Sequence, residues 1–573
     1  MKMNSRTVFW VILAISLLYT LSMFSGLEYH SAYFGHTYKA LHPESFPGDK
    51  YMPTDSPSGG SSYYWLARMV GDLWLDDRFT ILLFFLLAIL ALAGVDKTVQ
   101  ALGIHQVEGR VAILALMAMG HRFRDNIAIL VGNSDFYAGT FAGVAAIWLF
   151  AFFFSGDRFW KWGLCMLVLW SFTPRWAWFP IVMTLTLWHQ ERPVSTQRQL
   201  NGVLLLLLTG SCLVYYFWIR PPDGTHALLF DHLLKMENSE VHPFLDTAVG
   251  NLKYLLLTVL GIGFTPAIPI QARRIRIVAA LGGLLWLCGG IYLSYVPNWL
   301  KIPYLVPLAF NRAIQWPQYL LFVSLSVGLL QRMKTPDLAR RIFYLFILIA
   351  LYATFFLHKI ILTALLWIGV LLLRMKLRRH TAGPINWVEV SAYTFLLATV
   401  LVYGRGTFER IPHLKFMIQH GVVGDNPGAK WVGVDEYIRT QTPADAIILP
   451  IASRDYLWRP GVRFEGSLRT RTGRTMPLGS TWAVLFKYDL LRSLDVEGLH
   501  IENLISAWKD RDPKGVTQEL GYFGSIGYPF DYLVVENSEA DWIKDGKLNF
   551  QIEKIIGDFT IFRRQEVPRG NKS

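Results

Sequence analysis

Long apolar runs separated by polar loops constrain the fold of this chain more than any other feature of its sequence. Runs of roughly 17 to 22 residues match the thickness of the hydrocarbon core of a bilayer, so they predict membrane-spanning helices. The composition agrees, because 53% of the residues are hydrophobic and only 17% are charged. About thirteen spans are expected, at approximately 8–25, 79–95, 110–120, 137–155, 160–173, 175–190, 200–219, 248–268, 277–296, 314–331, 342–357, 359–373 and 386–404.

The basic residues predict the orientation of these spans. Lys2 and Arg6 precede the first span and place the N-terminus in the cytoplasm. Alternating spans then put the three most basic loops on the cytoplasmic side, and an odd number of spans puts the C-terminal block outside. These loops contain Arg273, Arg274 and Arg276; Arg332, Lys334, Arg340 and Arg341; and Arg374, Lys376, Arg378 and Arg379. We therefore interpret the formal charge of +13 as a topology signal and expect no nucleic-acid partner.

The predicted fold is an α-helical polytopic membrane protein with a small C-terminal extracytoplasmic α/β domain. Its transmembrane domain, residues 1–406, includes a long first outer loop at 27–78, and the C-terminal domain covers 407–573. Within that domain, apolar spacing predicts a helix at 430–439. Strands are expected at 446–451, 531–536 and 559–564. An arginine-rich segment at 459–474 is open to two interpretations, a solvated loop or a site for an anionic glycan or phosphate.

The first outer loop carries the strongest catalytic candidates. Glu28 follows the first span directly, and Pro and Gly residues on either side of Asp49 predict a turn that directs its carboxylate. A carboxylate at the membrane surface is a suitable general base for an acceptor hydroxyl. For any single acid in this loop, a solvated surface charge is the alternative. Residues 61–77 predict an amphipathic helix in the membrane interface.

Other predicted outer segments offer residues that could orient an acceptor or hold a divalent metal such as Mg or Mn; these are Asp125, Asp135, Glu240 and His242. Their spacing identifies no metal, and no other cofactor is expected. Four cations lie at predicted outer ends of spans, where they could bind the phosphate of a lipid-linked donor; these are Arg175, Arg312, Lys359 and Arg405. Snorkelling towards the interface is the alternative for each of them.

Several common signatures are missing. The sequence contains no P-loop, no GxSxG, no HExxH and no dinucleotide-binding glycine pattern. Its three cysteines each lie in an apolar run, so no disulfide is expected. Because the predicted cytoplasmic loops are short, chemistry is expected on the outer face. A substrate used there must be already activated and already across the membrane, and a polyprenyl-phosphate-linked sugar meets both requirements.

This layout resembles the GT-C superfamily of integral-membrane glycosyltransferases, and its overall plan is similar to that of the lipid A aminoarabinose transferases. The local sequences EYHSAYFGHTYKALHPESFPGD and WVGVDEYIRTQTPADAIILP are similar to bacterial GT-C-like proteins. The acidic pair that several GT-C families carry early in the first loop is not evident, since Glu28 stands alone there. The WWD-type motif of oligosaccharyltransferases is also missing, which argues against protein N-glycosylation.

The resemblance implies transfer of a sugar from a polyprenyl-phosphate donor to a lipid or glycan acceptor, with inversion, in a bacterial inner membrane with the C-terminal domain in the periplasm. Glu28 or Asp49 would be the base. Three alternatives remain open at this point: a polysaccharide polymerase or ligase, a transport protein, and a non-catalytic component of an envelope complex. A transporter would be expected to show internal repeats of spans, and none is clear in this sequence.

Overall fold

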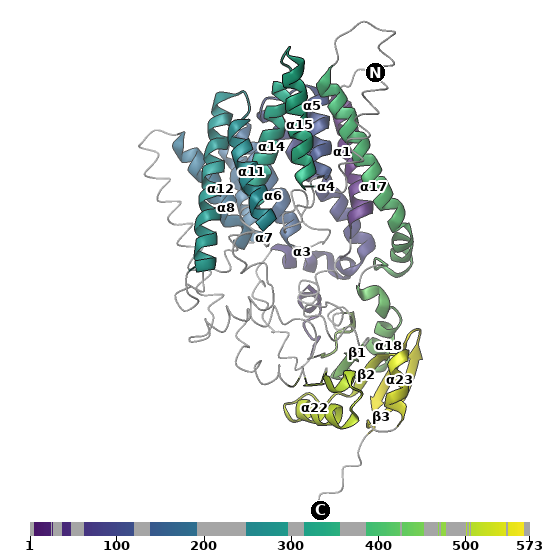
Figure 1. Cartoon of the computed structure of the whole chain (residues 1–573). Helices are drawn as coiled ribbons and strands as arrows, with labels where there is room; N and C mark the ends of the chain where they lie inside the picture. Colours follow the sequence, from purple (N-terminus) through teal and green to yellow (C-terminus); the bar gives the residue numbers. More distant parts are fainter. Residues whose placement is uncertain are drawn as a thin grey trace, which may run out of the picture. The chain divides into compact units, whose positions relative to one another are not determined.

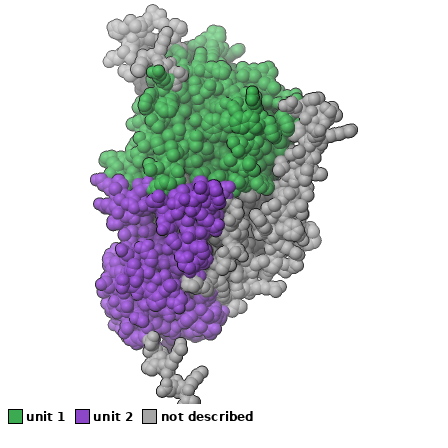
Figure 2. Space-filling model, turned by 180° about the vertical axis from the view of Figure 1, so that it is seen from behind, with its two compact units in different colours: residues 1–24, 79–220, 237–414 green, residues 25–78, 221–236, 415–573 purple. Residues whose placement is uncertain are grey.

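The computed structural model is mostly helical, with a small sheet near the C-terminus (Figure 1). It describes residues 5–24, 26, 37–46, 62–119, 138–172, 174–191, 248–295, 315–355, 386–424, 427–451, 468, 471–476, 500, 503–504, 506–545 and 548–565. The chain divides into two compact units, which are coloured separately in Figure 2. Unit 1 comprises residues 1–24, 79–220 and 237–414, and unit 2 comprises 25–78, 221–236 and 415–573.

Helices occupy each expected span that falls within the described residues. They are α1 (Ser5–Met23), α4 (Asp77–Ala101), α5 (Val107–Met119), α6 (Ala138–Phe154), α7 (Phe159–Phe172), α8 (Pro174–Gln190), α11 (Ala248–Gly263), α12 (Pro269–Tyr295), α14 (Gln315–Arg332), α15 (Leu338–Phe355) and α17 (Trp387–His420). The expected spans at 200–219 and 359–373 lie outside the described residues.

Three of these helices are long and apolar enough to cross a membrane by length and composition, namely Arg6–Met23 in α1, α4 and α17. Others are shorter; the 13 residues of α5 extend only about 20 Å at 1.5 Å per residue. The helical part of the chain is therefore compatible with a membrane protein. Thirteen spans and their orientation remain predictions.

Among the described helices of unit 1, α14 is the most buried, with every residue from Gln315 to Leu330 buried. Glycines allow α14 to approach its neighbours closely. A methyl group at Gly328 would collide with the backbone of Phe264, which follows α11, and one at Gly261 would lie 2.7 Å from Leu321 on α14. The close packing of α11 against α14 therefore depends on the absence of side chains at these two positions.

Polar side chains join several helix ends at one end of this bundle. Gln271, at the start of α12, donates to the carbonyl oxygens of Ala101 (3.3 Å) and Phe154 (2.9 Å) at the ends of α4 and α6. Gln331, at the end of α14, donates to Leu102 O (3.2 Å) and accepts from Ala267 N (2.8 Å). The C-terminal ends of α4, α6 and α14 therefore meet the N-terminal end of α12.

One basic region that was predicted as a loop is helical. Arg273, Arg274 and Arg276 lie within α12, which starts eight residues before the expected span at 277. The guanidinium of Arg274 makes this possible, because it pairs with both carboxylate oxygens of Glu191 at 2.6 and 2.7 Å and is largely buried. The expected span therefore marked the apolar part of a longer helix.

Helix α17 also continues well beyond its predicted end at residue 404. Its 34 residues extend about 51 Å, more than a bilayer core requires. The first residues of the predicted C-terminal block thus continue the last predicted span without a break in the helix.

Unit 2 contains a four-stranded mixed sheet in the order β1-β2-β4-β3. Its strands are β1 (Ile448–Ile451), β2 (Tyr532–Glu536), β3 (Phe550–Ile556) and β4 (Phe559–Arg564). β1 runs parallel to β2, whereas β4 is antiparallel to both β2 and β3. The short helical elements of the unit are α3 (Ser62–Val70), η2 (Gly71–Leu75), η6 (Pro427–Trp431), α18 (Val434–Gln441), α22 (Pro513–Ser525) and α23 (Asn537–Lys544).

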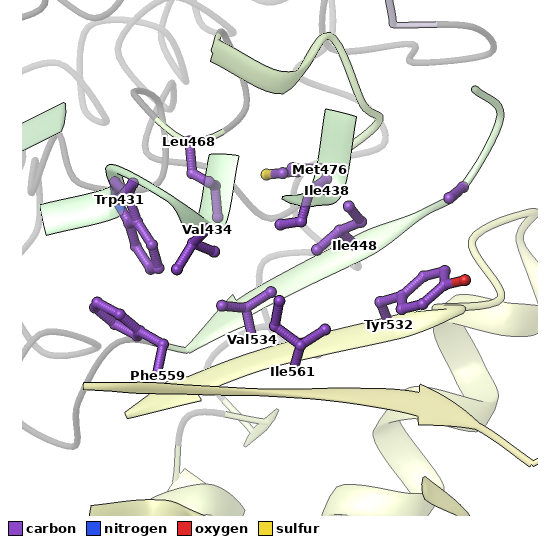
Figure 3. Close-up of a cluster of buried hydrophobic side chains, with 11 residues drawn as sticks. Trp431, Val434, Ile438, Ile448, Leu468, Met476, Tyr532, Val534, Phe559 and Ile561 are labelled. Carbon is purple, nitrogen blue, oxygen red and sulfur yellow. The ribbon is translucent and has the colours of Figure 1, made fainter. Parts of the chain in front are cut away.

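The sheet core forms because alternate residues of β2 and β4 point to opposite faces. Val534 and Ile561 lie on one face, in a cluster with Trp431 and Ile438 from η6 and α18 (Figure 3). The ring of Trp431 stacks on that of Phe559 with centroids 4.5 Å apart. Consecutive β2 residues Leu533, Val534 and Val535 are all fully buried, so both faces of this strand are covered.

The expected strands of the C-terminal sheet coincide with β1, β2 and β4, and the expected helix overlaps η6 and α18. The sequence analysis missed β3, α22 and α23. Strand β3 is an exposed edge, and its register shifts between Ile552 and Lys554. That irregularity breaks the two-residue alternation by which a half-buried strand is recognised.

We expect Gly328→Ala to destabilise unit 1 by about 2 kcal/mol or more, because the added methyl meets backbone atoms of Phe264 that cannot rotate away. Gly283→Ala on α12 is the matched control, since nothing lies within 4 Å of its new methyl group. Thermal unfolding of the full chain in detergent measures both variants. Equal melting temperatures for the two would contradict the close packing of α11 and α14.

The sheet should also respond to pH. Burial raises the pKa of Asp531, which precedes β2 and accepts a hydrogen bond from Ile447 N at 2.9 Å. Because this pKa is higher in the folded state than in the unfolded state, the neutral carboxyl contributes fully to the free energy of unfolding below about pH 4. That contribution is lost as the pH rises through the pKa of the folded state. The Asp531→Asn variant should not lose stability in this way as the pH rises, because its amide does not ionise and the amide oxygen still accepts the hydrogen bond from Ile447 N. Hydrogen exchange of β1 and β2 in urea at several pH values, with exposed Asp541→Asn as the control, measures the effect.

Candidate functional site

Most of the predicted site residues lie outside the described residues of the structure. These are Glu28, Asp49, Asp125, Asp135, Glu240, His242, Arg312 and Lys359. Arg175 belongs to α8, but the position of its side chain is not described. Their predicted roles remain predictions.

Arg405 is the predicted donor-binding cation whose side chain the structure describes. It lies on α17, is 82% exposed, and its Nε donates to Glu409 Oε1, one helical turn later, at 2.7 Å. An exposed pair of this kind contributes little to stability. Arg405 therefore has no strong structural role that would compete with the predicted one.

The described parts of the first loop belong to the same compact unit as the C-terminal block. They are the segment 37–46, which starts with a helical turn, and the segment 62–78, which contains α3 and η2. The sequence analysis placed this loop with the transmembrane domain. In the structure, the contacts of its described segments group them with residues 415–573 instead.

A left-handed turn at Phe46 attaches the first segment to the C-terminal domain. Phe46 has φ of 60°, is 3% exposed, and its N–H donates to Gly473 O at 2.8 Å. A bulky residue in this conformation costs about 1–2 kcal/mol, which burial of its ring, worth roughly 1.5–3 kcal/mol, can offset. Gly473 also has a positive φ, and a methyl group there would lie 3.0 Å from Ser45 Oγ.

Tyr38 is the most enclosed titratable side chain in this contact. Burial raises the pKa of its phenol, and the guanidinium groups of Arg439 and Arg474 only partly offset that effect. The phenol therefore stays protonated at neutral pH. Gly473 lies against its ring, since an added methyl there would be 3.4 Å from Tyr38 Cε1. Tyr38 thus fills the space between the loop and the arginines of the domain.

His42 links the two described segments of the loop. Its Nε2 lies 3.0 Å from Asp72 Oδ1 on η2, and its Nδ1 lies 3.8 Å from Glu44 Oε1. Its ring also packs against that of Tyr38, with centroids 4.6 Å apart. Both carboxylates are 78% exposed, so these contacts are accessible to water. The contact of His42 with Asp72 joins the segment 37–46 to η2.

A buried carboxylate fixes the end of the second segment. Asp77 is 2% exposed, its Oδ2 accepts from Val423 N at 2.9 Å, and its own N–H donates to Gly421 O at 3.0 Å. Asp76, beside it, accepts both Nε and a terminal nitrogen of Arg78. These bonds hold the end of the first loop against the residues that follow α17.

The arginine-rich segment has a structural role in its described part. Arg471 Nε donates to Asp435 Oδ2 at 2.5 Å, at the start of α18. Arg474 donates to the carbonyl oxygens of Arg439 (2.9 Å) and Thr442 (2.8 Å), at the end of the same helix. These two guanidinium groups therefore bind the two ends of α18. Arg459, Arg463 and Arg469 lie outside the described residues.

The predicted amphipathic helix at 61–77 is present as α3 and η2. Tyr63, Tyr64 and Trp74 are buried, and Trp74 Nε1 donates to Tyr63 OH at 3.2 Å. Trp65 and Met69, one turn apart, are 61% and 67% exposed. An exposed tryptophan–methionine stripe beside a polar loop agrees with a position in the membrane interface.

No group of three or more metal-ligating side chains occurs among the residues that the structure describes. Comparison with protein-family models, curated proteins and solved structures finds no match for this chain.

The described geometry defines a framework for the first loop, made by Tyr38, His42, Phe46 and Asp77. Sequence reasoning missed these residues as a group, although the Asp76-Asp77 pair at the start of an apolar run was a visible helix-start signal.

The contact of the loop with the C-terminal domain can be tested at Gly473. Gly473→Ala adds both a backbone cost and a contact with Ser45, so we expect hydrogen exchange in the segment 37–46 to accelerate about fivefold or more. Gly557→Ala is the matched control, because its φ of 55° carries a similar backbone cost while nothing lies within 4 Å. Unchanged exchange at 37–46 in Gly473→Ala would show that this contact does not order the loop.

Proposed function

We propose that this protein is a membrane glycosyltransferase that moves a sugar from a polyprenyl-phosphate donor to a lipid or glycan acceptor outside the cytoplasm. The observation that carries the proposal is the composition of unit 2. Residues 25–78, which contain the candidate bases, form one compact unit with the C-terminal domain. A loop that is built into a folded domain is a suitable place for chemistry on a lipid-linked substrate.

The described residues supply a support for such a site. The segment 37–46 ends three residues before Asp49, at the left-handed residue Phe46. Strained, well-determined backbone of this kind occurs preferentially near functional sites. Asp77 and its bonds to Gly421 and Val423 hold the other end of the loop. Both ends of the polar stretch that contains Asp49 are thus held by contacts within unit 2.

In the proposed reaction, Glu28 or Asp49 takes the proton from an acceptor hydroxyl. The hydroxyl oxygen attacks the anomeric carbon of the donor from the side opposite the phosphate, and the bond from that carbon to the phosphate oxygen breaks. The polyprenyl phosphate leaves with the electron pair, stabilised by a cation such as Arg175, Arg312, Lys359 or Arg405. Asp125, Asp135, Glu240 and His242 are proposed to orient the acceptor, with or without a divalent metal.

The test is transfer from a panel of polyprenyl-phosphate sugars by the purified full chain. Glu28→Gln or Asp49→Asn, whichever removes the base, should lower kcat by a factor of about 100 or more, the range typical of general base catalysis. Glu44→Gln is the control, since Glu44 is an exposed acid of the same loop. Full activity in both candidate variants would reject these bases, and no transfer from any donor would reject the function.

A further inference from the structure

The turn between α6 and α7 gathers positive charge. Lys97, near the end of α4, and Lys161, in the first turn of α7, each lie 2.8 Å from a different carboxylate oxygen of Asp157. Arg158, the next residue in the turn, is exposed. Two lysines therefore share one carboxylate, and the exposed Arg158 adds a third positive charge to the turn.

Close packing of α4 against α6 creates this arrangement. A methyl group at Gly94 would lie 2.7 Å from Ile147 on α6, and Trp148 Nε1 donates to Leu90 O on α4 at 2.9 Å. The two helices therefore approach closely one turn before Lys97. This approach places the ammonium of Lys97 beside the turn that follows α6.

The charges in this group do not balance. Burial raises the pKa of Asp157, but hydrogen bonds and charges from Lys161 and Lys97 outweigh that effect and hold its pKa below the usual value. Asp157 is thus ionised at neutral pH and neutralises one of the three cations. Its two lysine partners also lie over the ring of Phe152, at 5.1 and 5.6 Å from the centroid, which holds the ammonium groups in place.

Exposed aromatic residues border the group. Phe159 and Trp160, at the start of the apolar helix α7, are 56% and 59% exposed. Aromatic rings at the polar end of an apolar helix are typical of the membrane interface, where they contact the glycerol and upper acyl region of lipids. The group therefore combines surplus positive charge with a surface suited to lipid chains.

Two other arginines at helix ends of unit 1 lack this surplus. Arg110 pairs with Asp96, and Arg274 pairs with Glu191, each through two nitrogens and both carboxylate oxygens. Both arginines are largely buried, with 14% and 9% of their side chains exposed. These one-to-one pairs serve the packing of the bundle and leave little charge for an external ligand.

We propose that Lys97, Arg158 and Lys161, bordered by Phe159 and Trp160, form a binding site for the phosphate of an anionic phospholipid. The lysines, preorganised by Asp157 and Phe152, contact the phosphate, and Arg158 supplies a further charge from the surface. The aromatic rings contact the lipid below its headgroup, which distinguishes a lipid from free phosphate. This site does not depend on glycosyl transfer and lies on other residues than the proposed donor site.

The test is native mass spectrometry of the full chain taken from mixed micelles of phosphatidylglycerol and phosphatidylcholine with the same acyl chains. The wild type should retain phosphatidylglycerol preferentially. The Lys97→Gln, Lys161→Gln double variant should lose about twentyfold of that preference, because each basic residue near an anionic surface contributes about 1 kcal/mol, or about fivefold. Arg158→Gln should lose about fivefold and leaves Asp157 and its lysines intact, so it tests the site even if the double variant does not fold.

The matched control is the Lys334→Gln, Arg340→Gln double variant, which removes two exposed charges beside α14 and α15. It should retain the wild-type preference within about twofold, less than the loss expected for one specific charge. An equal loss in the control would show that only overall charge matters and would overturn the proposal. Displacement of the lipid by excess inorganic phosphate at matched ionic strength would overturn it too, since the site would then bind phosphate without the lipid.

Discussion

A buried peptide group needs a hydrogen-bond partner, and this constraint explains how several helix ends meet in unit 1. Helices satisfy their own interior peptide groups, but the last carbonyl groups of each helix have no partner within it. Gln271 and Gln331 satisfy several of these, because they donate to the carbonyl oxygens of Ala101, Phe154 and Leu102. The same bonds fix which helix ends meet, so backbone satisfaction and helix arrangement have one cause.

Unit 2 joins two parts of the chain that are far apart in sequence. Its sheet core is formed by residues after 430, yet Phe46 and Asp77 from the first loop bond to Gly473 and Val423. The C-terminal domain therefore also holds parts of the first loop in place. Any site that the first loop forms depends on contacts supplied by this domain.

The apolar runs predicted where helices occur because a span must be apolar over most of its length. They did not predict helix bounds. Arg274 lies inside α12 and Arg405 inside α17, since a charged side chain ends a hydropathy pattern but does not end a helix when it finds a partner. Similarly, β4 follows from its run of apolar residues, whereas β3 carries Glu553 and Lys554 on an exposed edge and shows no such pattern.

The sequence by itself determined the helical class, three of the strands near the C-terminus and the choice of Glu28 and Asp49 as candidates, because these depend on local composition and on chemistry that a residue type carries alone. Only the tertiary structure decided the partners of the charges. Arg471 and Arg474 bind the ends of α18, whereas Lys97 and Lys161 share the carboxylate of Asp157 and the exposed Arg158 adds to the positive charge of the turn. The physical reason is that the net charge of a site depends on which side chains meet, and residues far apart in sequence meet only when the chain folds.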